Sequence, residues 1–295
     1  ENYFLYTRAY QLIVEAYGIE SALANKFYTQ MVALAKITDR GNAFYQFASP
    51  YYGQANTPEA AYRLLGNKDF ASSLSQFLTG DQSFNVALHE NTALRRKFAE
   101  YLYHYPFNYR SWDLKYSDLD RALAWKGDFE QQLKSGKVAQ LHYIWLPNDH
   151  TGGTNPDYLK PEQLVAQNDA ALGRIIETIS HSPVWKESLI LITEDDAQNG
   201  PDHVDATRTV SLAAGPYVRR ESLVHDRYDQ LSLFRTIGLL LGLKPLNLND
   251  TMAVPMFGIF SARPDNRPYT PPAPSKQLVE ADLKLYQMFG NAKTP

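Results

Sequence analysis

Two segments of the chain gather side chains that could bind a metal ion and move protons. One is Asn148-Asp149-His150-Thr151, which directly follows an apolar run. The other covers residues 194–205 and reads EDDAQNGPDHVD, with five carboxylates, one imidazole and no basic side chain. Carboxylates packed this densely repel one another unless a cation neutralises them. A divalent ion held by carboxylate oxygens and a His nitrogen would neutralise such a segment.

The spacing of these residues does not name the metal. The Asp-x-Asp-x-Asp-Gly ladder of an EF-hand is absent, and so is the His-Glu-x-x-His pair of a zincin. Ligation through oxygen and nitrogen permits zinc, manganese, magnesium or calcium. Asp and Asn also populate ordinary turns, which is the structural alternative for each segment taken alone.

The segments follow predicted strands, which would position them. Apolar runs predict strands over residues 138–146, 188–193 and 209–214, and helical periodicity predicts helices over 118–133, 161–180 and 228–241. This order favours an α/β layer architecture with helices on both faces of a sheet. In such folds ligands bind beyond the carboxyl ends of the strands, where both segments would lie.

The first third of the chain has a different character. Fourteen of the 20 tyrosines fall within residues 1–120, and apolar spacing predicts helices over 3–37 with a break at Gly18, over 57–66 and over 92–103. These helices are either a packed layer or cap, or an aromatic recognition surface. We therefore divide the chain into a Tyr-rich helical region (1–105), an α/β core (106–270) and a Pro-rich linker with a terminal helix (271–295).

Composition excludes several classes of protein. The 295 residues include 44% hydrophobic and 21% charged residues, which is typical of a folded chain. A net charge of −3 argues against a general nucleic-acid binder. The absence of cysteine excludes disulfides, thiolate catalysis and iron–sulfur clusters. No apolar run reaches the ~20 residues that span a bilayer. We expect a chain that starts at Glu1, without a signal-peptide pattern, to be a trimmed form.

From about Phe107 to Tyr269, the sequence resembles the bacterial phosphoesterase family. This family contains phospholipase C-like and acid phosphatase-like enzymes of the alkaline phosphatase superfamily. The resemblance is carried by LPNDHT at 146–151, the EDDAQNGPDHVD segment, NDxxLGR at 168–174, SHS at 180–182 and YDxxSxxRTI at 228–237.

The resemblance implies an alkaline phosphatase-like α/β/α sandwich and metal-dependent hydrolysis of phosphoric esters. It implies metal ligands at Asp195, Asp196 and His203, and a further ligand at Asp149. His150 and Asp205 are the expected catalytic residues, and Asn148 and Arg208 the expected substrate contacts. It also implies an exported protein, periplasmic or secreted.

One part of the family pattern has no counterpart. The family carries a Glu-Asn metal pair after an N-terminal strand, and a Ser or Thr nucleophile upstream of the Asn-Asp-His loop. Glu90-Asn91 has the letters but precedes a predicted helix, and Glu1-Asn2 stands at the start of the chain. The sandwich is therefore expected to be incomplete, and the chain to be a C-terminal part of an enzyme, joined segments, or a variant without a nucleophile.

Two other functions remain open. One is a non-catalytic module on the same scaffold that binds carbohydrate or protein through the Tyr-rich helices, because aromatic side chains are good anchors. The other is a purely structural calcium site. The expected partner under the first hypothesis is a phosphate-ester substrate, and the oligomeric state is open.

Overall fold

The computed structural model describes residues 2–34, 47–51, 53–55, 57–104, 109–110, 112–195 and 209–290. The chain divides into two compact units. The first comprises Glu1–Gly127, Ile144–Asn168 and Gln277–Asp282, and the second comprises Asp128–Tyr143, Asp169–Lys276 and Leu283–Pro295.

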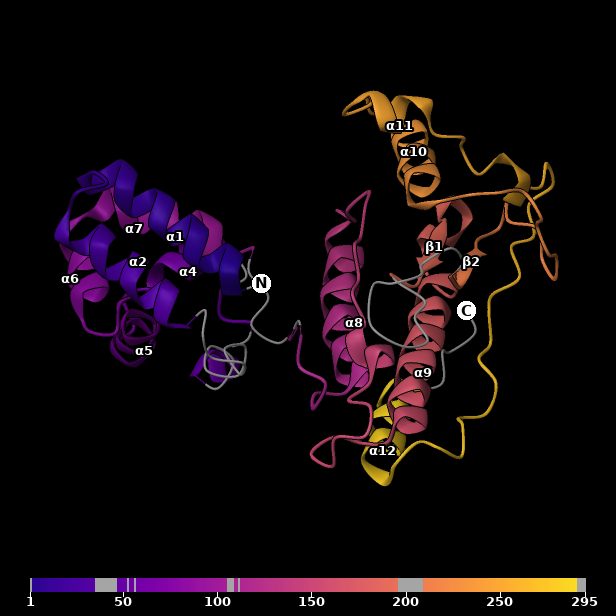
Figure 1. The fold of residues 1–295 in the computed structure, drawn as a ribbon, viewed down its shortest axis with the longest axis horizontal. Coiled ribbons are helices and arrows are strands. Elements are labelled where there is room, and N and C mark those ends of the chain that lie inside the picture. Colours follow the sequence, from indigo (N-terminus) through magenta and orange to yellow (C-terminus); the bar gives the residue numbers. More distant parts are fainter. Residues whose placement is uncertain are drawn as a thin grey trace. The chain divides into compact units, whose positions relative to one another are not determined.

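Helices dominate residues 2–104, as the apolar spacing predicts (Figure 1). The predicted break at Gly18 is confirmed, since this residue has a left-handed φ of +88° that glycine adopts without strain. The helices are α1 (Asn2–Tyr17), α2 (Ala22–Leu34), the short 3-10 helix η1 (Ser49–Tyr51), α4 (Pro58–Leu64), α5 (Lys68–Thr79), α6 (Ser83–Glu90) and α7 (Thr92–Leu102).

Helix ends in this region follow local capping chemistry. Thr57 caps α4 by accepting a hydrogen bond from the Ala60 amide at 3.0 Å, and Pro58 occupies the first helical position, as predicted. The helices α5 and α6 were not predicted. Asn67 caps α5 by accepting from the amides of Asp69 and Phe70, and this Asn before an apolar repeat was the signal for it.

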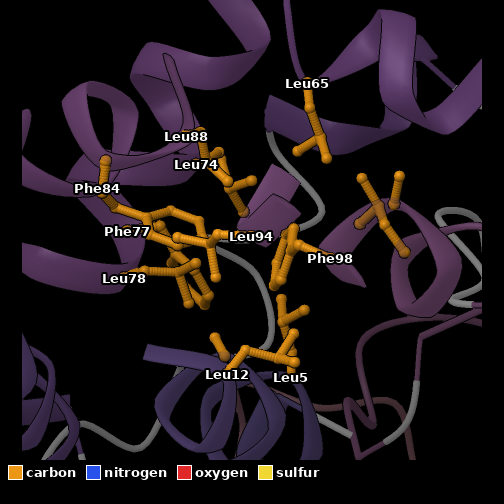
Figure 2. Packing of buried hydrophobic residues seen from close by; sticks show 14 of the residues in the cluster. Leu5, Leu12, Leu65, Leu74, Phe77, Leu78, Phe84, Leu88, Leu94 and Phe98 are labelled. Carbon is orange, nitrogen blue, oxygen red and sulfur yellow. The ribbon is translucent and has the colours of Figure 1, made fainter. Parts of the chain in front are cut away.

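These helices share one apolar core (Figure 2). Leu5 and Leu12 of α1, Leu74 of α5, Phe84 of α6 and Phe98 of α7 have exposed fractions of 1% or less. The rings of Phe84 and Phe98 meet edge to face, with centroids 5.1 Å apart. The aromatic side chains of the core favour the packed helical layer over an aromatic recognition surface.

The described chain as a whole is mostly helical. The remainder combines helices with a short strand pair. Its elements are α8 (Asp118–Ser135), η2 (Pro147–His150), α9 (Pro161–Ser180), η3 (Pro183–Glu187), β1 (Ile190–Thr193), β2 (Ser211–Ala214), α10 (Gln230–Leu240), α11 (Leu248–Met252), η4 (Phe257–Ile259) and α12 (Glu280–Met288). The predicted helices over 118–133, 161–180 and 228–241 are confirmed as α8, α9 and α10.

Two of the three predicted strands are present as β1 and β2. They pair antiparallel, with Ile190 opposite Ala214 and Thr193 opposite Ser211. Among the described residues these strands form a two-stranded sheet, so this part of the chain shows an α-rich fold and not an α/β/α sandwich. The residues of β1 are at most half-buried, whereas a strand covered on both faces would be buried.

The predicted strand over residues 138–146 is wrong. This segment pairs with no strand among the described residues, although the exposure of its side chains alternates from Leu141 to Leu146 as in an extended chain. Two of its carbonyls accept hydrogen bonds from side chains instead. The Tyr109 hydroxyl donates to Trp145 O at 2.5 Å, and the Asn168 amide donates to Leu146 O at 2.8 Å.

Candidate functional site

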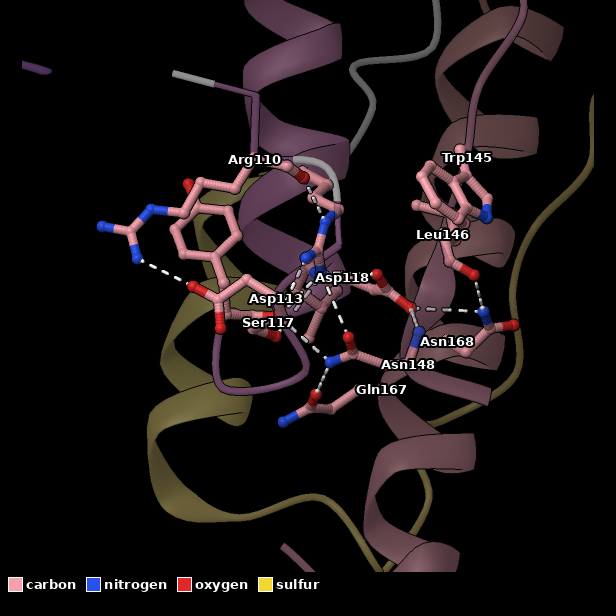
Figure 3. Close-up of polar contacts among 12 residues, drawn as sticks. Arg110, Asp113, Ser117, Asp118, Trp145, Leu146, Asn148, Gln167 and Asn168 are labelled. Atoms are coloured by element: carbon pink, nitrogen blue, oxygen red, sulfur yellow. Dashed lines mark hydrogen bonds and ion pairs between the residues drawn. The ribbon is translucent and has the colours of Figure 1, made fainter. Parts of the chain in front are cut away.

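A fully buried cation, Arg121, bonds to Asn148 within the first unit. Figure 3 shows Asp118, Asn148, Gln167 and Asn168 around this place. The Arg121 side chain of α8 has an exposed fraction of 0%. Its guanidinium donates to the carbonyl oxygens of Arg110, Asp113 and Tyr116 at 2.6, 2.8 and 2.7 Å. Burying a guanidinium is tolerable only when its donors are satisfied and its charge is paired, so these bonds anchor the chain before α8 to the helix.

Asp118 is the counter-charge of Arg121. Its Oδ1 accepts from Arg121 Nη1 at 2.9 Å, and its Oδ2 accepts from the backbone amide of Asn148 at 3.1 Å and from Asn168 Nδ2 at 3.2 Å. Burial raises the pKa of the Asp118 carboxyl to about 6, against the opposing effect of the Arg121 charge. Asp118 therefore ties the start of η2 to both α8 and α9.

Asn148 continues this polar network toward α12. Its Oδ1 accepts from Arg121 at 3.1 Å, and its Nδ2 donates to Gln167 Oε1 at 2.6 Å. Gln167 Nε2 then donates to Asp282 Oδ2 at 2.8 Å. The Asn148 side chain is 0% exposed and its amide orients the loop in this structure, while its predicted contact with substrate stays a prediction. We call Asp118, Arg121, Asn148, Gln167 and Asp282 the Arg121 network.

The residues that follow Asn148 lie at the surface above this network. Asp149 is half-buried and His150 is exposed, with His150 Nδ1 3.1 Å from Thr151 O. Thr151 has φ 61° and ψ 168°, a region that is essentially reserved for glycine. A β-branched residue in this conformation is strained, and such strain persists where the surrounding structure holds it, most often at functional sites.

Two glycines shape the rest of this loop. A Cβ at Gly152 would lie 2.6 Å from the Tyr158 ring, so a larger residue there would displace that ring. Gly153 has a positive φ of 58°. Both positions keep the chain close to η2, and the exposed His150 ring packs edge-on against Trp112 with centroids 4.7 Å apart.

The acidic segment begins in the second unit, directly after β1. Glu194 is fixed across the strand pair: its amide donates to Val210 O at 3.0 Å, and its carboxylate accepts from the Thr209 hydroxyl at 3.2 Å. Asp195 is exposed, and its carbonyl accepts from Gln230 Nε2 at 3.3 Å. The predicted site residues Asp196, His203, Asp205 and Arg208 lie outside the described residues.

The metal-ligand prediction stays a prediction, and two of its four residues, Asp149 and Asp195, are described. Asp149 belongs to the first unit and Asp195 to the second. Within the ranges that the structure describes, no three His, Asp or Glu side chains converge as a metal site would require. Of the eight predicted site residues, four are described, and three of these, Asn148, Asp149 and His150, lie together in η2.

Sequence reasoning missed the buried members of the Arg121 network. Asp118 and Arg121 stand at i and i+3 at the start of a predicted helix, a pattern that usually indicates an exposed pair. The available signal was the low charge of the helix face on which they lie. Asn168 was predicted to face inward on the helix over 161–180 and was noted in a family motif, whereas Gln167 and Asp282 were not noted at all.

Helices of the described chain give no sign of crossing a membrane: each lacks the length or the apolar character that a bilayer requires. A scan of the sequence against protein-family models found no match, and searches of curated proteins and of solved structures found none either. The phosphoesterase resemblance therefore rests on the residues quoted for it.

Proposed function

We propose that this chain hydrolyses phosphoric esters with a divalent metal ion, or forms part of the enzyme that does so. The observation that carries the proposal is η2 and the loop that follows it. The short helix η2 carries the half-buried Asp149 and the exposed His150 on a base fixed by the buried Arg121 network, and the chain continues through a strained Thr151. Catalytic side chains must be held in a fixed geometry, and a buried network beneath exposed polar groups provides such support.

The acidic segment supplies the second support. Asp195, Asp196 and His203 are the proposed metal ligands, and Asp149 is a further one; oxygen and nitrogen donors of this kind suit zinc, manganese, magnesium or calcium. The ion, when bound, would neutralise charge on the non-bridging phosphate oxygens. Arg208 is the proposed phosphate contact, and Asp205 is a further proposed catalytic group.

The proposed reaction is the hydrolysis of a phosphorus–oxygen bond. A water oxygen bonds to phosphorus, the bond to the alcohol oxygen breaks, and a proton from His150 moves to that leaving oxygen. The proton that the water loses restores the protonated His150. His150 is the proposed proton donor because it is exposed and its ring orientation is set by Trp112. Export from the cytoplasm belongs to the same proposal.

Hydrolysis of p-nitrophenyl phosphate and bis-p-nitrophenyl phosphate tests the proposal. The chain is assayed with each of the four metals and with chelator. We expect metal-dependent release of p-nitrophenol from both esters. Because p-nitrophenolate leaves without a proton, His150 is tested on phenyl phosphate, whose hydrolysis should fall ~100-fold or more in His150→Ala, the usual scale of lost acid–base catalysis. Asp195→Asn should also lower metal affinity in equilibrium dialysis.

Matched control variants separate these effects from general damage. Asp157→Asn and His225→Gln change exposed residues of the same types and should retain activity. Absence of hydrolysis with every metal, or equal losses in the controls, contradicts the proposal.

A further inference from the structure

A pair of indole rings lies at the surface beside the proposed proton donor. Trp112 and Trp145 are 48% and 42% exposed, and their ring centroids are 5.8 Å apart with a tilt of 33°. The His150 ring meets Trp112 edge-on, with an interplanar angle of 78°. All three residues belong to the first unit.

The pair is held in place rather than left free. The Tyr109 hydroxyl donates to the carbonyl of Trp145, and Asn168 donates to the next carbonyl, that of Leu146. The two rings also contact each other. Exposed indoles that are fixed in this way lose little conformational entropy when a ligand stacks on them, which favours binding.

The size of the exposed surface indicates what it can bind. Two half-exposed indoles offer roughly 200 Å², whereas a stable protein interface buries about 800 Å² on each partner. Leu141 and Tyr143, at alternate positions before Trp145, are also exposed, at 55% and 87%. The two paired indoles, with the His150 ring edge-on to Trp112, by themselves match a single planar ring, which stacks on aromatic side chains whatever its substituents.

We propose that Trp112 and Trp145 form a stacking platform for a planar aromatic ring carried by the alcohol part of the phosphoric ester. This inference rests on the proposed function and narrows it to esters with a ring near the leaving oxygen. The ring lies on the indoles while the phosphoryl group faces His150, whose edge contact with Trp112 links the two places.

Binding of two non-hydrolysable probes tests the platform directly. Phenylphosphonate and ethylphosphonate carry the same acid group and differ in the ring. By calorimetry with the intact chain, we expect phenylphosphonate to bind about 10-fold more tightly, a typical effect of one stacked ring. Trp112→Leu should abolish that preference, and Trp112→Phe should retain part of it. Val165→Ala is the matched control and should leave the preference intact. Equal affinities for both probes, or an unchanged preference in Trp112→Leu, overturn the proposal.

Rates of hydrolysis distinguish a failure of the stacking platform from a failure of the proposed hydrolase function. Phenyl phosphate and ethyl phosphate are compared by kcat/KM, and we expect the Trp112→Leu loss to fall on phenyl phosphate alone. If phenylphosphonate binds through Trp112 but neither ester is cleaved, the hydrolase proposal fails and the platform stands. If both esters are cleaved and Trp112→Leu affects them alike, the platform fails and the hydrolase stands.

Discussion

The helices of residues 2–104 and helix α10 of the second unit use apolar residues in opposite ways. In the first region, side chains such as Leu74 and Phe98 are fully buried in one shared core. In α10 the buried side chains are the polar Ser232 and Thr236, while Phe234 and Leu240 are 57% and 59% exposed. The short helix α11 buries none of its residues.

The difference teaches that an apolar helix becomes part of a core only when a complementary surface faces it. The α1–α7 helices supply such surfaces to one another, because each has an apolar stripe at helical spacing. Helix α10 is apolar over most of its circumference, a composition typical of a helix that is covered on several sides. Its stability in this chain therefore depends more on its caps than on burial.

The strongest test of this comparison truncates one buried and one exposed phenylalanine to alanine. Phe98→Ala empties a site in the helical core and should lower the free energy of unfolding by about 3–5 kcal/mol, whereas Phe234→Ala removes an exposed ring and should change it by less than about 0.5 kcal/mol. Urea titration followed by circular dichroism measures both. Similar costs for the two variants would show that Phe234 is covered in solution, which would break the comparison.

The buried Arg121 should approach the cost of a core truncation. Arg121→Met leaves the Asp118 carboxylate buried without its cation and three carbonyls without their donor, so we expect a loss of about 3–5 kcal/mol. Arg263→Met, at an exposed position, is the control and should lie within about 0.5 kcal/mol of the parent. A loss below about 1 kcal/mol for Arg121→Met would mean that the network opens in solution.

The free energy of unfolding should depend on pH, because the pKa of Asp118 differs between the folded and the unfolded chain. Its pKa is about 6 in the folded chain, above the value near 3.9 of an unfolded chain, so the folded state binds the extra proton between these values. The contribution of this group is fully present below pH ~4 and is lost as the pH rises through about 6. The difference in unfolding free energy between the parent and Asp118→Asn should fall by about 2–3 kcal/mol over that window. A flat difference from pH 4 to 7 contradicts the assignment.

The smallest expected effect concerns the capping box of α10. Asp229 Oδ1 accepts from the Ser232 amide at 2.8 Å, and Ser232 Oγ accepts from the Asp229 amide at 3.3 Å. Asp229→Ala should cost about 1 kcal/mol, and Asp229→Ser should recover most of it. Calorimetric melting detects this if α10 unfolds with the rest of its unit. No change in either variant would show that α10 melts separately.

Signals that act between neighbouring residues predicted individual helices and turns well. They did not predict how distant elements pair and pack. Thr57-Pro58, Gly18 and the spacing of Leu94, Phe98 and Leu102 each act through neighbouring residues, and each prediction is confirmed. The strand predicted over 138–146 failed because a strand requires a partner, and alternation along the sequence cannot supply one. The same limit applies to the sandwich, which was inferred from the order of apolar runs.

At the candidate site, too, the sequence indicated residue types but not the contacts between distant residues. The sequence singled out Asp149 and His150, and the structure places both at the surface on one short helix. It assigned Asn148 to substrate, although the residue is enclosed by Arg121 and Gln167, which are 27 and 19 positions away along the chain. Burial of an Asn depends on distant elements, so its residue type alone could not distinguish a ligand contact from a structural amide.

The reach of the Arg121 network along the chain has a consequence for biosynthesis. The Ser117 hydroxyl donates to Asp282 Oδ1 across 165 positions, whereas the Tyr6 hydroxyl reaches the Phe77 carbonyl across 71. At translation rates of roughly 5–20 residues per second, Asp282 is made roughly 10–30 seconds after Ser117. The N-terminal helices can therefore close their core on the ribosome well before Ser117 and Gln167 can bond to Asp282.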